Sequence, residues 1–236
     1  MQITENLWRE MSCSVQPFPQ GVVDVPKPIG GTAFFPGGFG LWSTEDDPRG
    51  QIAIVGQDFN SIRTYNQALA DGTEIHSSTT WRELQKILLD NRVSPRRCFF
   101  TNVYMGLRDG GKETGPFPGL PGVCSTQEFR DFSRRSIDFF RYQLEFSRPK
   151  LILTLGLEPI RALARDVFQI AKPSSMTEIT EIYREVRLSY GNTTVVALTH
   201  PSFYGRNVVN RRYGIEVGKK AENAMISDGL KAAKLG

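Results

Sequence analysis

Four short apolar runs divide the chain beyond residue 50 into a regular pattern. Each run holds four to six residues, is rich in β-branched or aromatic side chains, and is closed by a polar residue or a glycine. The runs cover residues 52–55, 98–103, 151–155 and 195–199. Continuous apolar runs of this length are typical of strands that are buried on both faces of a sheet. The pattern therefore predicts four central strands.

Segments with helical spacing of their apolar residues separate these strands. Capping-box spacing at 80–83 and at 125–128 predicts two helix starts, and further helices are expected over about 158–170 and 217–234. Residues 186–190 alternate in polarity, and Gly191-Asn192 can turn them back into the last apolar run as a hairpin. Strands that alternate with helices predict a single three-layer α/β/α domain around a mainly parallel four-stranded sheet.

Two stretches show neither pattern. Residues 16–48 are rich in Pro and Gly, so we expect residues 1–50 to form an irregular arm packed on a domain that spans residues 51–236. The loop 106–122 holds six glycines and three prolines. It is either a flexible surface excursion or part of a binding site, and its place after Asn102 favours a binding site.

Composition narrows the class of protein. The 236 residues carry 29 Lys plus Arg against 25 Asp plus Glu and are 39% hydrophobic, which argues against disorder, collagen and coiled coil. No apolar run has the length of a membrane span, and residues 1–18 show no secretory signal. Three distant cysteines argue against a disulfide framework, a zinc site or an iron–sulfur cluster. We expect a cytoplasmic protein without metal or cofactor.

The predicted strands end in residues that can carry chemistry. Asp58, Asn102, Gly156 and His200 follow or close the four apolar runs. Ligands bind at the carboxyl ends of strands in open α/β sheets, so these residues form a candidate site. A lone histidine at a strand end is more often structural than catalytic, and convergence with the acid and the amide would reverse that interpretation. The second histidine, His76, lies in a polar stretch and is expected in a solvated loop.

Four blocks of sequence carry a resemblance to a known family. In order along the chain they read GQDFN, FFTNV, LTLGL and HPSFY, at residues 56–60, 99–103, 153–157 and 200–204. The first resembles the water-activating motif G-Q-D-P-Y, and the last resembles the motif H-P-S-P-L, of the uracil-DNA glycosylase superfamily. The two middle blocks are similar to the strand that reads the base and to the Gly-Ser loop that touches phosphates. The resemblance covers roughly residues 51–207.

The resemblance implies hydrolysis of an N-glycosidic bond after the nucleotide has been flipped out of the DNA stack. It implies that Asp58 orients the attacking water and stabilises the oxocarbenium-like sugar. Asn102 would pair with the N3 and O4 edge of uracil, and the Gln57 backbone would shape the pocket. His200, as a neutral imidazole, would donate to O2 of the leaving base. No metal and no cofactor is needed.

The same resemblance implies the DNA contacts. Ser202 and the loop at Gly156 would hold phosphates, which position the DNA but do not specify its sequence. Tyr204 takes the place of the leucine that wedges into the vacated stack, where an aromatic ring can stack on bases. Seven basic residues against three acidic ones follow His200, which is the whole net charge of +4. This basic stretch fits a nucleic-acid surface or a solvated helix face, and we expect DNA contacts for Arg206, Arg211 and Arg212, with Lys231 and Lys234 in solvent.

Two departures from the family pattern bear on specificity. Asn60 stands where the family has the tyrosine that blocks the thymine methyl group, so thymine or 5-substituted uracils are not excluded. Phe59 replaces the proline of the first motif and, with Tyr65, is a candidate for the ring that stacks on the flipped base.

The sequence thus predicts a monomeric, nucleoid-associated DNA glycosylase whose partner is DNA containing uracil or a damaged base. Three alternatives stay open. The chain is a glycosylase for 5-substituted uracils or deaminated purines, a non-catalytic protein that binds DNA or abasic sites, or an enzyme that acts on free nucleotides. Only DNA binding should weaken steeply with salt, because phosphate contacts release counterions.

Overall fold

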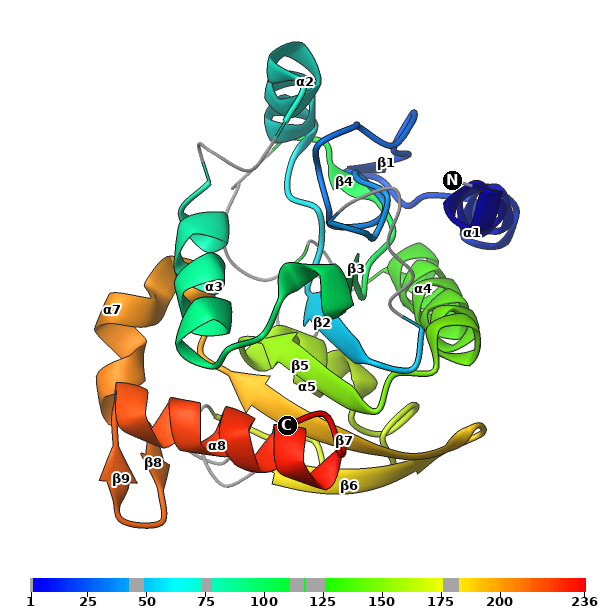
Figure 1. Cartoon of the computed structure of the whole chain (residues 1–236). Coiled ribbons are helices and arrows are strands. Elements are labelled where there is room, and N and C mark those ends of the chain that lie inside the picture. Colours follow the sequence, from blue (N-terminus) through cyan, green and yellow to red (C-terminus); the bar gives the residue numbers. More distant parts are fainter. Residues whose placement is uncertain (1, 43–48, 74–77, 111–116, 118–125, 176–182) are drawn as a thin grey trace.

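A computed structural model describes residues 2–42, 49–73, 78–110, 117, 126–175 and 183–236 (Figure 1). Its central strands are β2 (Ile52–Gly56), β3 (Cys98–Asn102), β5 (Leu151–Leu155), β6 (Tyr183–Leu188) and β7 (Gly191–Leu198). Its α-helices are α1 (Gln2–Ser14), α2 (Ile62–Asp71), α3 (Thr79–Asp90), α4 (Gln127–Ser147), α5 (Leu157–Leu163), α7 (Tyr204–Asn207) and α8 (Lys219–Ala232). Two small ladders pair β1 (Val22–Val23) with β4 (Leu107–Arg108), and β8 (Arg212–Tyr213) with β9 (Glu216–Val217). Three 3₁₀ turns are η1 (Pro95–Arg97), η2 (Pro201–Phe203) and η3 (Val208–Asn210).

The central sheet is mainly parallel and has five strands in the order β3-β2-β5-β7-β6. The four predicted strands run parallel to one another, and β6 pairs antiparallel with β7. The prediction of four strands was therefore one short. As an edge strand, β6 buries Val186 between the exposed Glu185 and Arg187, so it lacks the continuous apolar run of the other four. The hairpin is confirmed, but it turns through residues 189–190 rather than at Gly191-Asn192.

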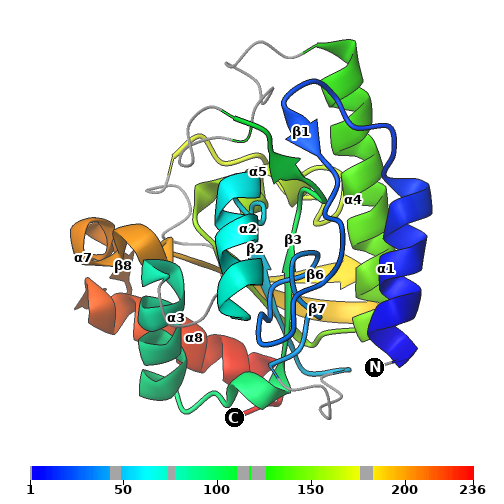
Figure 2. The same cartoon turned by 90° about the horizontal axis from the view of Figure 1, so that it is seen from above.

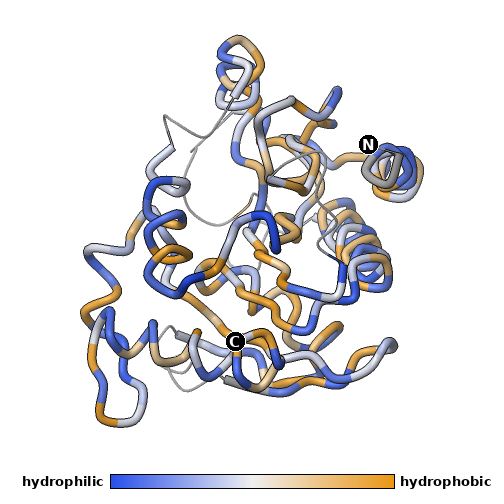
Figure 3. The backbone as a smooth tube through the Cα atoms, viewed as in Figure 1, coloured by the Kyte–Doolittle hydropathy of each residue, from blue (hydrophilic) through white to orange (hydrophobic). Residues whose placement is uncertain are grey.

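Helices lie on both faces of the sheet. Buried side chains of α3 and α8, such as Leu84 and Met225, pack with Ile54 on one face. On the other face α1, α4 and α5 pack with Ala53 and Val55. Figure 2 shows α1 beside α4, away from α3 and α8. Figure 3 shows that hydrophobic colour follows the central strands, while hydrophilic positions mark the outer faces of the helices.

The amino-terminal arm differs in part from the irregular segment that was expected. Residues 2–14 form helix α1, which the sequence analysis did not predict. The Pro/Gly-rich part runs along the edge of β3, where the amide of Phe35 donates to the carbonyl of Phe100 and the amide of Phe100 donates to the carbonyl of Gly40. Phe34 and Phe35 are both buried, in the cores on opposite faces of the sheet. The arm thus covers an edge that would otherwise be open.

Several helices begin or end at other residues than the sequence predicted. Helix α3 starts after Ser78 rather than at Thr80, and Thr126 caps α4 through its hydroxyl, which accepts from the amide of Phe129 at 3.3 Å. Helix α5 stops at Leu163, earlier than expected. Helix α2 was missed because it buries only Tyr65 and Ala68. No helix in the described parts of the chain is long and apolar enough to cross a membrane.

Candidate active site at the carboxyl ends of the parallel strands

The predicted site residues lie along one edge of the sheet. Asn102 ends β3, Asp58 follows β2, Gly156 follows β5 and His200 follows β7, in the spatial order of these strands. The strands end nearly level, since Gly56 pairs with Asn102 and Leu155 pairs with Leu198. With about 4.8 Å between neighbouring strands, the edge from β3 to β7 spans roughly 14 Å. The order and register of the strands therefore place an amide, an acid and an imidazole along one edge of the sheet.

Asp58 is held in a buried ion pair that the sequence analysis did not predict. Its Oδ2 accepts from Nη2 of Arg108 at 2.6 Å, and its Oδ1 accepts from Nε of Arg108 at 3.1 Å and from the amide of Asn60 at 2.8 Å. Both ion-paired side chains are only 5% exposed. Burial raises the pKa of Asp58, while the hydrogen bond and charge of Arg108 oppose that rise. Among the described residues, Oδ2 accepts a single hydrogen bond, which leaves it able to accept another.

Asn102 is buried between β2 and the arm. Its Nδ2 donates to the carbonyl of Phe35 at 2.9 Å, which fixes the plane of the amide. Its Oδ1 lies against Gly56, where an added Cβ would come within 2.4 Å of that oxygen. Gly56 therefore provides the space that the Asn102 amide occupies, and any side chain at position 56 would displace it.

Gly156 and His200 are in direct contact across the end of the sheet. Gly156 has φ +88°, in the left-handed region that favours glycine, and an added Cβ would lie 3.1 Å from the Cβ of His200. The amide of Gly156 donates to the carbonyl of Leu198 at 2.9 Å, close to where β7 leads into His200. A side chain at position 156 would push against the imidazole-bearing residue.

The imidazole of His200 has a defined hydrogen-bonding state. Its Nδ1 accepts from the amide of Ser202 at 3.2 Å, so the neutral ring carries its proton on Nε2. Burial lowers the pKa of His200 below its ordinary value of 6.5, which favours this neutral form. The ring of Phe203 lies 5.9 Å away, centroid to centroid. His200 is thus prepared to donate a hydrogen bond from Nε2.

The loop after His200 carries two aromatic rings, of which only Tyr204 had an expected role. Tyr204, expected to wedge into DNA, is buried to 7% exposure in the core cluster that also holds Leu198 and Met225, so its ring is not available as a wedge in this arrangement. Phe203 is 45% exposed on the same loop and was missed. Ser202 is exposed and shares a 2.6 Å hydrogen bond with Thr80 of α3, which ties the loop to that helix, and Arg206 is exposed.

The residues expected to recognise the base are only partly available. Phe59 is 3% exposed and packs under Gly37, where an added Cβ would lie 2.0 Å from its ring; Tyr65 is 1% exposed, and its hydroxyl donates to the carbonyl of Lys27. Neither ring can stack on a flipped base in this arrangement. Gln57 is half-buried, and its carbonyl accepts from the amide of Tyr104 at 2.9 Å.

Asn60 combines an unusual backbone with an unused acceptor. Its φ is +86°, a conformation in which asparagine is several-fold enriched over most residues. Its Oδ1 is buried and accepts no hydrogen bond from the described residues. The asparagine thus fits the backbone here, and it presents an acceptor beside Asp58.

The basic stretch after His200 is less exposed than its sequence indicates. Arg211 is 1% exposed and lies in the core, so the expectation of a DNA contact for Arg211 is wrong. Arg212 and Arg206 are exposed, and Lys219 pairs with Asp90 at 2.6 Å. His76, Cys124, Ser125 and most of the loop 106–122 lie outside the described residues. Of that loop, residues 106–110 and Phe117 are described, and the guanidinium of Arg108 lies 5.4 Å from the ring centre of Phe117.

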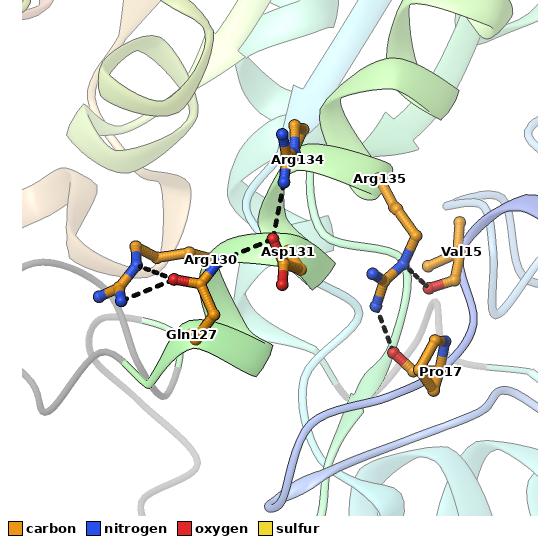
Figure 4. A network of polar contacts seen from close by, with 7 residues as sticks. All are labelled: Val15, Pro17, Gln127, Arg130, Asp131, Arg134 and Arg135. Carbon is orange, nitrogen blue, oxygen red and sulfur yellow. Dashed lines mark hydrogen bonds and ion pairs between the residues drawn. The ribbon is translucent and has the colours of Figure 1, made fainter.

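A second arginine-rich region lies on α4, away from the strand ends. A surface hollow of about 480 Å³ follows this helix. Figure 4 shows that its arginines bond near neighbours: Arg130 donates to Gln127 and Arg134 donates to Asp131. The adjacent Arg135 donates to the carbonyls of Val15 and Pro17 in the arm. These contacts link side chains within α4 and fasten the helix to the amino-terminal arm.

Comparison with known proteins adds no family to these observations: no protein-family model and no curated protein matches the chain.

Proposed function

We propose that this chain is a DNA base glycosylase that hydrolyses the N-glycosidic bond of uracil, or of a related damaged base, in DNA. One observation carries the proposal: Asn102, Asp58 and His200 lie along one edge of the sheet, with His200 neutral and its proton on Nε2. The resemblance of the four sequence blocks to uracil-DNA glycosylases supports the same reading of this edge.

Each group has a separate part in the proposed reaction. Asn102 is buried and its Nδ2 donates to the carbonyl of Phe35, so pairing of its amide with the N3 and O4 edge of a flipped uracil requires the arm at Phe35 to move aside. As the bond between C1′ and N1 breaks, Nε2–H of His200 donates to O2 and stabilises the negative charge on the leaving base. The carboxylate of Asp58 stabilises the positive sugar and orients water through the remaining acceptor position of Oδ2. The water oxygen bonds to C1′ and the water loses one proton, while the uracil anion takes up one proton, so the net reaction consumes one water and releases neutral uracil and an abasic sugar.

Arg108 reduces the electrostatic stabilisation that Asp58 can give to the sugar cation. Its guanidinium offsets the negative charge of Asp58, so the sugar cation gains less stabilisation while the two are paired. The same ion pair favours a second candidate, in which the chain binds DNA or abasic sites without cleaving them.

Asn60 favours a wider range of bases. Its buried Oδ1 lacks a donor among the described residues, and the hydroxyl of a 5-hydroxymethyl group or the N1–H of a deaminated purine would supply one. A glycosylase for such bases would use the same Asp58 and His200.

The test is cleavage of labelled oligonucleotides that contain uracil, 5-hydroxymethyluracil or hypoxanthine, single- or double-stranded, with alkali-labile sites as the readout. Asp58→Asn and His200→Ala should each lose at least 100-fold in rate, the usual scale for one catalytic group. Asp109→Asn, an exposed neighbour of Arg108, is the matched control and should retain full activity. Salt-sensitive DNA binding without cleavage of any substrate would contradict the glycosylase proposal and support the second candidate, a protein that binds DNA without cleaving it.

A further inference from the structure

An ion pair is buried behind the loop that carries His200. Nε of Arg211 lies 3.0 Å from Oε2 of Glu222 on α8, and the two side chains are 2% and 0% exposed. Neither residue belongs to the four sequence blocks, and neither lies on the edge that holds the candidate site.

The pair holds the backbone that leads into His200. Oε2 of Glu222 accepts from the amide of Thr199 at 2.8 Å. Nη2 of Arg211 donates to the carbonyl of Ala197. Between them, the carbonyl of Leu198 accepts from the amide of Gly156. Three consecutive residues before His200 are therefore bonded by three different segments of the chain.

Stability alone gives a weak reason for this arrangement. Burial raises the pKa of Glu222 and lowers that of Arg211, so the charged forms of both are opposed by desolvation. Oε1 of Glu222 and Nη1 of Arg211 have no hydrogen-bond partner among the described residues, and Nε of Arg211 contacts Glu222 as an ion pair without forming a hydrogen bond. An apolar pair of similar size often serves a core as well as a buried ion pair does, or better. What an apolar pair lacks is the acceptor for Thr199 and the donor for Ala197.

We propose that Arg211 and Glu222 are positioning residues for His200: by fixing the backbone of residues 197–199, they hold the imidazole so that Nδ1 faces the amide of Ser202 and Nε2–H faces the reacting base. The role of Nε2–H toward a base rests on the proposed function. The fixed orientation of the ring does not.

The test compares two double variants that both lack the ion pair. Arg211→Met with Glu222→Gln keeps an oxygen that can accept from Thr199, whereas Arg211→Met with Glu222→Leu removes it. The readout is the tautomer of His200 from imidazole ¹⁵N shifts at pH 8. The chain has two histidines, and a His76→Asn background assigns the signals. Thermal unfolding of each variant shows which are folded.

We expect the wild type to show the Nε2–H tautomer and the Gln variant, which keeps one of the two anchors, to show a minor fraction of the other tautomer. We expect the folded Leu variant, which keeps neither anchor, to show mixed tautomers with kcat for uracil release at least tenfold lower and KM little changed. A folded Leu variant with a wild-type tautomer and kcat would overturn the proposal. If that variant does not fold, Arg211→Lys takes its place, because one amine cannot reproduce the two-pronged contact of the guanidinium. An unchanged His200 tautomer in Arg211→Lys would then overturn it.

The two proposals fail separately. If the wild type cleaves no substrate, the tautomer measurement still decides whether the pair positions His200. If the wild type cleaves uracil and the Leu variant keeps both tautomer and rate, the glycosylase stands and the positioning role falls.

Discussion

Replacing Arg108 with glutamine removes the partner of a buried carboxylate. Removing one member of a buried ion pair typically costs about 3–5 kcal/mol, because the remaining charge is left without a partner. The geometry supports a value in this range, since Arg108 supplies two of the three hydrogen bonds to Asp58 and both side chains are 5% exposed. With a urea m value of about 2 kcal/mol/M, the midpoint should fall by roughly 2 M.

The loss should depend on pH in a defined direction. The pKa of Asp58 is already raised above 3.8 by burial, and loss of Arg108 raises it further. A carboxyl with a higher pKa in the folded state binds its proton more tightly there, so stability falls as pH rises from 3.8 through the folded-state pKa. The cost of Arg108→Gln should therefore be largest near pH 8 and shrink toward pH 4.

Urea unfolding followed by circular dichroism at pH 8 and pH 5 measures both effects. Adding Asp58→Asn to Arg108→Gln removes the unpaired charge and should recover most of the loss at pH 8, to within about 1–2 kcal/mol of wild type. An equal cost of Arg108→Gln at both pH values, with no recovery in the double variant, would show that the ion pair does not dominate the energetics here.

Four further predictions test single residues in or near the site. Tyr204→Phe should leave the free energy of unfolding unchanged or raise it by about 1 kcal/mol in thermal unfolding, because the buried hydroxyl of Tyr204 has no partner among the described residues. Phe203→Ala should weaken DNA binding in a gel shift without changing the free energy of unfolding, because the ring of Phe203 is exposed. Asn60→Tyr should destabilise by about 1–2 kcal/mol and Asn60→Gly far less, because φ is +86°. Cleavage should decline as pH falls through the pKa of His200, which burial places below 6.5, because catalysis needs the neutral ring; a rate that stays constant across the pH range in which ¹⁵N shifts show the ring becoming protonated would exclude that role.

The central strands and the line of residues at their ends were predictable because their signal is local. A buried parallel strand needs a continuous apolar run, and the residue that follows it lies at the ligand-binding edge by topology alone. Strand β6 was not included among the predicted central strands, because an edge strand alternates in polarity and lacks a continuous apolar run. Helix α2 escaped because two buried side chains leave almost no periodic pattern.

Burial and pairing over long separations were not predictable in the same way. Arg211 and Arg212 are neighbours in a basic stretch, yet one is in the core and the other is exposed. Tyr204 is buried and the adjacent Phe203 is exposed, because the chain forms the turn η2 directly after His200. The pairing of Asp58 with Arg108 joins residues fifty positions apart, which no local pattern encodes. Such contacts depend on the packed fold.

The most direct test of the glycosylase proposal is mass-spectrometric detection of both products from a uracil-containing oligonucleotide. The proposed mechanism predicts free uracil and an abasic strand in equal amounts from the wild type, with both reduced together at least 100-fold in His200→Ala. A wild-type protein that binds the oligonucleotide but releases no base, under conditions where Asp109→Asn behaves identically, would contradict it.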